Sequence, residues 1–149
     1  LFGFVKELLT PESVHIKRQL RRLAVLLSKQ PDERPVAMAL RGERLRGLFA
    51  DPCRFEVRTY RLAQTLSPAE IASQYLRARA AYSHIEVVIH DIRVLDIRAA
   101  EADARFTVRA MAKRGGALET ATAEVACRLA KPDDSWLFAE FVEVEVLQK

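Results

Sequence analysis

Residues 84–97 read HIEVVIHDIRVLDI, and this stretch decides the fold class. Apolar and polar residues alternate along it, as they do in a β-strand with one buried face. The apolar residues keep one parity as far as Ile89 and take the opposite parity from Ile92 onward. A β-bulge shifts a strand by one residue in this way and bends it. The sequence therefore predicts one long strand that bends near His90-Asp91.

The same alternation continues towards the C-terminus. Gly115 and Gly116 lie between two alternating stretches and predict a hairpin turn. In the last stretch the parity slips once more, at Glu140-Phe141, which predicts a second bend. Besides residues 84–97, the strands expected are 53–57, about 104–113, 118–131 and 135–147.

The part of the chain before this meander is predicted to be mainly helical. A first helix begins after Thr10, which suits the N-cap position, and a second runs from Pro35 through Phe49. The third helix is the best marked, because Ser67 and Glu70 form a capping box at its start. Three N-terminal helices packed on a strongly bent antiparallel sheet define an α+β domain. The bends let the sheet curl around the helices and form a cone.

Length and composition are those of one globular domain over residues 1–149. Half of the residues are hydrophobic, and no apolar run approaches the roughly 18 to 20 residues that span a bilayer. The two cysteines, Cys53 and Cys127, match no metal-binding spacing. They are expected to be small buried residues in a reducing compartment or a disulfide in an oxidising one, and the sequence leaves both open.

The start of the chain allows two interpretations. Position 1 is Leu1, and four of residues 1–5 are apolar side chains. Residues 1–10 are either the remnant of a linker or membrane anchor, or an apolar segment that packs on the domain. The first interpretation predicts an anchored, periplasmic domain, and the second is equally consistent with the cytoplasm.

The net charge is +4, and the excess of Lys and Arg lies in the first 50 residues. Lys17, Arg18, Arg21 and Arg22 give the first helix a basic face, which is a way to attract the phosphates of nucleic acid or of a membrane. Acidic residues interleave, and no aromatic side chains accompany the arginines as a stacking platform. A solvated helix face is the favoured interpretation, and nucleic acid is not expected as a partner.

The order of two helices, a short strand, a third helix and a long meander resembles the nuclear transport factor 2-like superfamily, whose members share a cystatin-like α+β cone. Two segments carry the resemblance locally: residues 48–52, LFADP, where the second helix passes into the first strand, and residues 134–138, DSWLF, at the turn into the last strand. The resemblance covers about residues 11–149 and implies a bacterial-type member. Because proteins with this fold have many different functions, the resemblance predicts the fold, and the function has to be inferred from the residues of the site.

Enzymes of this superfamily carry a carboxylate or a His–Asp pair inside the cone. Here alternation places Glu56 opposite the apolar face of its strand, and Val125 and Cys127 occupy the apolar row of the penultimate strand. Chemistry of the isomerase type is therefore not expected. His90 and Asp91 are the candidate catalytic residues, because a bulge can re-aim one of them into the cone. A surface pair at a bend is the favoured alternative.

Tyr60, Tyr75 and Tyr82 are the candidate ligand-binding residues, because a tyrosine can line a pocket with its ring and orient a ligand with its hydroxyl. Core packing with a wet hydroxyl is the more common role. The sequence contains no Gly-rich phosphate loop, Cys/His cluster or nucleophile elbow, so no cofactor and no metal site is predicted.

Two functions remain open at this point. The favoured one is a non-catalytic binding or scaffold domain that takes a small apolar ligand in the cone or a protein partner on the sheet. The alternative is a small-molecule isomerase, dehydratase or cyclase that uses polar groups inside the cone. A homodimer is the expected assembly, and membrane association is expected only through an N-terminal anchor.

Overall fold

The computed structural model describes residues 10–29 and 33–148. The expectation for residues 1–10 therefore lies outside the described residues, apart from Thr10. Within the described part, three helices, one 3-10 turn (η1) and six strands follow one another. Their bounds are α1 Pro11–Leu27, α2 Pro35–Arg46, β1 Phe49–Val57, η1 Arg58–Tyr60, β2 Leu62–Leu66, α3 Pro68–Ala81, β3 His84–Ile97, β4 Glu101–Arg114, β5 Ala117–Ala130 and β6 Leu137–Gln148. None of the described helices combines the length and the apolar character needed to cross a membrane.

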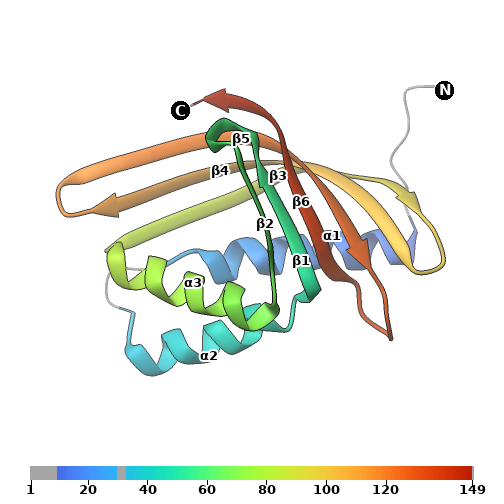
Figure 1. Ribbon diagram of the computed structural model, residues 1–149, viewed down its shortest axis with the longest axis horizontal. Helices are drawn as coiled ribbons and strands as arrows, with labels where there is room; N and C mark the ends of the chain where they lie inside the picture. The colour runs from blue at the N-terminus through green and yellow to red at the C-terminus, as the bar shows by residue number, and fades with distance from the viewer. Residues whose placement is uncertain (1–9, 30–32, 149) are drawn as a thin grey trace.

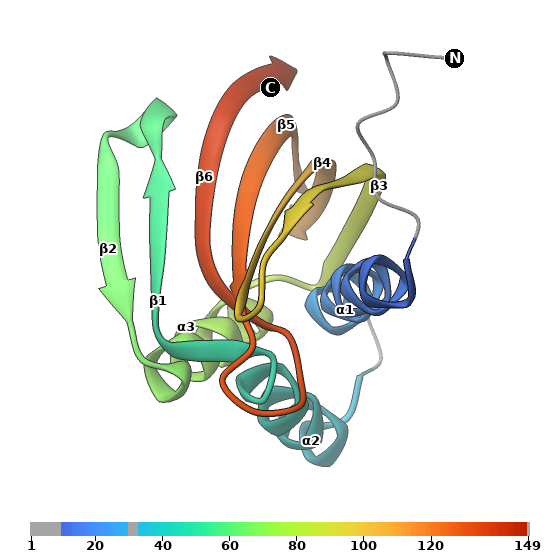
Figure 2. The same cartoon turned by 90° about the vertical axis from the view of Figure 1, so that its right-hand side faces the viewer.

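The strands form one sheet in the order β2-β1-β6-β5-β4-β3, which curls strongly with the three helices on one side (Figure 1 and Figure 2). The predicted α+β class, with helices packed on a bent sheet that forms a cone, is confirmed. The sheet is mixed rather than wholly antiparallel, because β1 pairs with β6 in parallel. Strands β3 to β6 follow one another through short turns, so each pairs antiparallel with the next. Strands β1 and β6 are separated by most of the chain, and a long connection of this kind allows them to pair in parallel.

The long strands bend where the alternation slips. In β3, Asp91 and Ile92 together lie opposite Phe106 alone, and Asp91 adopts a φ of 53°, in the left-handed region that Asp tolerates better than most residues. In β6 the extra residue nearest the predicted slip is Ala139, one position before it, and the pairing with β5 shifts again at Val144 and at Leu147. These bulges change the direction of the strands and let the sheet close around a hollow.

The helices start as predicted, but α2 is shorter than expected. Thr10 and Ser13 form a capping box at α1, with Ser13 N–H donating to Thr10 Oγ1 at 3.1 Å. The prediction that α2 runs through Phe49 is wrong, since it ends at Arg46. The reason is tertiary: the carbonyl of Leu48 accepts a hydrogen bond from the N–H of Phe138 at 2.8 Å, so the chain has already joined the sheet there.

Strand β2 was not predicted from the sequence. It is an edge strand that pairs only with β1, and its side chains are half-buried or exposed without a clear alternation. Edge strands of this kind are short and leave little periodic signal. Its position matters for the site, because β2 extends one wall of the cone.

The core of the cone is a cluster of five aromatic rings contributed by β1, β4 and β6. Neighbouring ring centroids lie 5.2–6.4 Å apart, within the range of favourable aromatic pairs. Phe55 and Phe141 stack at 5.5 Å with 11° between their planes. The members of the cluster are Phe49, Phe55, Phe106, Phe138 and Phe141. Phe138 is fully buried, and the other four rings also contribute to the lining of the cavity described below.

Glu12 ties the start of α1 to the turn that precedes β6. Its carboxylate accepts hydrogen bonds from Lys131 Nζ at 3.0 Å and from Trp136 Nε1 at 2.9 Å. The hydrogen bond from Lys131, followed by that from Trp136, lowers the pKa of Glu12 below its ordinary value of 4.5.

This lowered pKa predicts a pH-dependent effect of Glu12→Gln. Because the folded state binds the proton less readily than the unfolded state, the ionised carboxylate stabilises the fold above pH 4.5, and the contribution is lost as the pH falls through the folded pKa. Urea unfolding of both proteins from pH 7 to pH 3 should show a less stable variant at neutral pH and a difference that shrinks in acid. A difference that is constant over this range would contradict the assigned role.

Candidate ligand-binding cavity

The curled sheet and the helices enclose a cavity of about 520 Å³. Its walls come from the inward rows of the strands and from all three helices, with Leu45 as the contribution of α2. The bulge in β3 lies where that strand stops lining the cavity: Ile89 is a lining residue, the next two residues are exposed, and Val94 beyond them is buried in the core. The apolar side chains that the strands contribute include Phe55, Val57, Val87, Ile89, Val108 and Val125.

The cavity opens to solvent between β2 and α3. Leu62 on β2, and Gln74 and Ala78 on α3, are lining residues that are themselves exposed, so they mark the mouth. Deeper lining residues such as Phe106 and Ile71 are buried. An apolar ligand can therefore enter along α3 without a strand having to separate.

Among the described residues, only four that line the cavity have polar side chains, namely Gln64, Gln74, Tyr75 and Arg79. The polar end of Tyr75 is bound elsewhere, because its hydroxyl donates to the carbonyl of Leu26 at the end of α1. Burial raises the pKa of Tyr75, so the phenol stays protonated at neutral pH. The ring of Tyr75 faces the cavity as apolar surface, and its hydroxyl is not available to a ligand.

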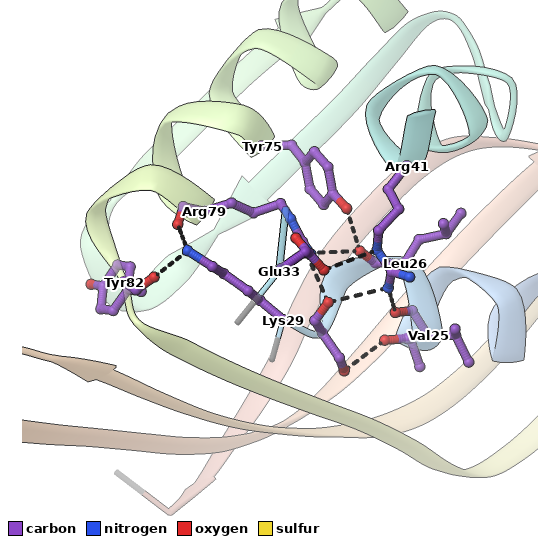
Figure 3. A network of polar contacts seen from close by, with 10 residues as sticks. Val25, Leu26, Lys29, Glu33, Arg41, Tyr75, Arg79 and Tyr82 are labelled. Carbon is purple, nitrogen blue, oxygen red and sulfur yellow. Dashed lines mark hydrogen bonds and ion pairs between the residues drawn. The ribbon is translucent and has the colours of Figure 1, made fainter. Parts of the chain in front are cut away.

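Arg79 is the centre of a buried polar network, drawn in Figure 3. Its side chain is 1% exposed and pairs with Glu33, whose side chain is 10% exposed. Its Nη1 donates to the carbonyl oxygens of Leu26 at 3.1 Å and Ser28 at 2.8 Å. A buried guanidinium needs such partners, because an unpaired buried charge is costly.

Two further cations complete this network. Arg41 on α2 donates to the carbonyls of Val25 and Ser28 and lies 3.5 Å from Glu33. Lys29 donates to the carbonyls of Arg79 and Tyr82 at the end of α3. All of these acceptors are carbonyls in the last turns of α1 and α3 or just beyond them, where cations are favoured. The network fastens the three helices together next to the cavity.

The candidate catalytic pair lies outside the cavity. His90 Nδ1 and Asp91 Oδ2 are 3.1 Å apart, but the side chains are 46% and 76% exposed. Neither residue lines the cavity, whereas the preceding Ile89 does. The bulge brings the pair together at the surface of the sheet and does not turn it inward.

The three candidate tyrosines are not brought together. Tyr75 lines the cavity, as described above. Tyr60 lies on η1 and is mostly exposed. Tyr82 lies outside the lining, with its hydroxyl 3.4 Å from Glu119 and its ring beneath the guanidinium of Arg114. A role for Tyr60 or Tyr82 in ligand binding stays a prediction without support from their positions.

The positions of Glu56, Val125 and Cys127 follow the predicted alternation. Glu56 lies outside the lining and forms ion pairs with Arg54 and Arg58, each at 3.0 Å. Val125 lines the cavity and Cys127 is buried in the core. Among the described residues, no Asp, Glu or His side chain lines the cavity.

Arg79 is the residue that sequence reasoning missed. Ile71, Tyr75 and Arg79 follow one another at steps of four along α3, and all three are buried. The spacing was available as a signal, since residues four apart share one helix face. An arginine was not expected to continue a buried row, because arginine is rarely buried unless it is paired.

With the cone and its cavity described, the fold can be placed among known proteins. The chain has the nuclear transport factor 2-like, cystatin-like cone fold. No family model and no curated protein matches the chain. Solved structures do match, at identities that establish the fold alone.

Three of these structures illustrate the range of the fold. The Kfla4162 protein of Kribbella flavida is 14% identical with a TM-score of 0.73, over 91% of each chain. A nuclear transport factor 2-like protein with a cystatin-like fold from Novosphingobium aromaticivorans is 14% identical with a TM-score of 0.65, over 89% of this chain and 80% of that one. A hexachlorocyclohexane dehydrochlorinase (LinA type 2) is 12% identical with a TM-score of 0.69, over 90% of this chain and 84% of that one.

Both cysteines are free thiols inside the core. Burial raises the pKa of Cys53 to about 12 and holds the pKa of Cys127 well above its ordinary value. Because the thiolate is the reactive form and is scarce in the folded protein, we expect the native protein to react with a thiol reagent more slowly than the unfolded chain by a factor of about 100 or more. A colourimetric thiol assay with and without guanidinium chloride measures this. Rapid labelling of either cysteine in the native protein would contradict it.

Proposed function

We propose that this chain is a non-catalytic binding domain whose cone holds a small apolar ligand. The observation that carries the proposal is the cavity itself: about 520 Å³ of space lined almost wholly by apolar side chains. Pockets for small molecules have volumes of roughly 300–1,000 Å³ and are lined in this way. The expected homodimer stays a prediction beside it.

The polar groups near the cavity support binding over catalysis. General acid–base chemistry needs a group that titrates within reach of the substrate. The described lining offers two amides, a phenol bound to the Leu26 carbonyl and the paired guanidinium of Arg79. The shared fold with a dehydrochlorinase does not alter this, because the fold carries many functions and the site decides.

The proposal is tested by titrating the protein with Nile red, an apolar dye whose fluorescence rises in dry surroundings. We expect saturable binding at one site per chain. Val125→Trp places a bulky ring in the cavity and should weaken binding at least tenfold. The matched control is Val36→Trp on α2, where the native side chain is 74% exposed and is not part of the lining.

Thermal unfolding of both variants shows whether they keep the native fold. We expect that they do, since the ring at position 125 fills empty space in the cavity. Absence of saturable binding to the native protein would overturn the proposal. Equal weakening by both substitutions, or by neither, would show that the dye binds outside the cone and would also overturn it.

A further inference from the structure

We infer that the groove between α1 and α2 binds the headgroups of anionic lipids, so that the domain associates with a negatively charged membrane surface. This inference is independent of the ligand proposed for the cone, because it concerns the outer side of the helices. It begins from a cluster of arginines that have no carboxylate partner among the described residues.

The groove has a volume of about 650 Å³ and lies between two helices at the outside of the fold (Figure 2). Its charged lining residues are Arg18, Arg21 and Arg22 of α1 and Glu43 and Arg44 of α2. The buried Gln19 also lines it, donates to the carbonyl of Trp136 at 2.8 Å and accepts a hydrogen bond from Arg22 Nη1 at 3.1 Å. That contact orients one guanidinium, and the four arginines together concentrate positive charge in one hollow.

The arginines of the groove differ from most arginines of the sheet. Arg18, Arg21 and Arg44 have no ion pair and no side-chain hydrogen bond among the described residues. On the strands, four arginines each pair with a carboxylate, namely Arg54, Arg93, Arg105 and Arg128. The fold therefore neutralises positive charge on the sheet and leaves it unneutralised in the groove, where it attracts an anionic partner.

Exposed apolar side chains lie in the same rows as these arginines. Residues spaced by three and four share one face of a helix, and two such rows border the groove. Their members are Val14, Arg18, Arg21 and Val25 on α1 and Val36, Leu40 and Arg44 on α2. The valines and the leucine of these rows are 51–74% exposed. The surface thus combines unpaired cations with aliphatic side chains that are open to solvent.

This combination favours a lipid surface over nucleic acid. Aliphatic side chains can enter the boundary between headgroups and acyl chains while the arginines stay at the lipid phosphates, whereas a phosphodiester backbone offers them no apolar partner. Among the described residues, no aromatic side chain lines the groove, so bases would find no stacking platform. The sequence predicted membrane association only through an anchor, because only the fold brings Arg44 and Leu40 beside α1.

The test is cosedimentation of the protein with vesicles of phosphatidylcholine alone, or of two parts phosphatidylcholine and one part phosphatidylglycerol. We expect the protein to bind the anionic vesicles about tenfold or more tightly than the neutral ones, and this binding to weaken as salt is added. Equal binding to both kinds of vesicle, or no binding to the anionic ones, would overturn the inference and leave the proposal for the cone standing.

Two double variants locate the binding surface. Arg18→Gln/Arg21→Gln should weaken binding to the anionic vesicles about 25-fold, from about fivefold for each arginine near the surface. The matched control is Arg77→Gln/Arg109→Gln, which removes the same charge at two exposed positions outside the groove. Equal weakening by both pairs would show that net charge alone drives binding and would overturn the assignment of the groove. All four side chains are exposed, and circular dichroism checks that the variants fold.

The apolar residues separate a lipid surface from other polyanions. Val25→Ser/Leu40→Ser should weaken binding to the anionic vesicles about fivefold, because less apolar area enters the interface. Leu118→Ser, at a side chain that is 56% exposed just after the turn between β4 and β5, should leave the binding unchanged. No effect of Val25→Ser/Leu40→Ser would overturn the inference. If a DNA duplex then bound the native protein but not Arg18→Gln/Arg21→Gln, nucleic acid would be the partner of the groove instead.

Discussion

Replacement of Arg79 by Met is expected to lower the free energy of unfolding by about 3–5 kcal/mol, the usual cost of removing one partner from a buried ion pair. Met has a similar length but no donor, so it leaves Glu33 without its principal buried partner. It also removes the hydrogen bonds to the carbonyls of Leu26 and Ser28 at the end of α1. Urea unfolding followed by circular dichroism measures the loss.

Two comparisons isolate the cause of this loss. Arg77→Met lies on the same helix at an exposed position and should change stability by less than about 0.5 kcal/mol. The double variant Arg79→Met/Glu33→Gln removes the charge that Arg79→Met leaves unpaired, so it should recover part of the stability. An Arg79→Met protein as stable as Arg77→Met would contradict the structural role given to the network.

Phe138→Ala is expected to cost a comparable amount, about 3–5 kcal/mol, the typical cost of removing a buried phenylalanine ring. Phe138 is fully buried on β6, and its ring lies 5.2 Å from Phe141 and 5.9 Å from Phe49. The N–H of Phe138 donates a hydrogen bond to the carbonyl of Leu48, which fixes the backbone here. The space left by the ring therefore cannot easily close by movement of the surrounding chain. Thermal and urea unfolding should both show the loss.

The control for this substitution is Tyr60→Ala, which removes a ring that is mostly exposed on η1. It should change stability by no more than about 0.5 kcal/mol. If the two substitutions have similar effects, the aromatic cluster does not hold the curled sheet together in the way described.

The features that the sequence predicted are those with a local cause. The capping box of Ser67 and Glu70 starts α3 because both partners lie within one turn. The bend at Asp91 follows from a parity slip that is visible within residues 84–97, since a bulge reverses the faces of a strand. Local patterns of this kind need no knowledge of the rest of the chain.

The features that the sequence did not predict depend on contacts across the fold. Helix α2 stops before Leu48 because that carbonyl is bonded to Phe138, ninety residues later (138 − 48). Strand β2 exists only as a partner of β1. Arg79 is buried because acceptors from α1 and Glu33 converge on it, and no pattern in α3 alone reveals those acceptors.

In the candidate site, too, some features follow from local sequence patterns and others depend on contacts across the fold. Alternation predicted that Glu56 faces away from the apolar row and that Val125 belongs to it, and both positions agree. The direction of His90 and Asp91 was left open, because a bulge can re-aim either side chain. Only the three-dimensional arrangement shows that both remain at the surface and that the lining is apolar.

The most direct test of the account is a crystal structure of the protein grown with 2-bromonaphthalene, in which anomalous scattering locates the bromine. The account predicts one strong bromine peak inside the cone, within contact distance of Phe55 and Val125, and no comparable peak elsewhere. A cone that stays empty or filled by its own side chains, with bromine only on the outer surface, would contradict it.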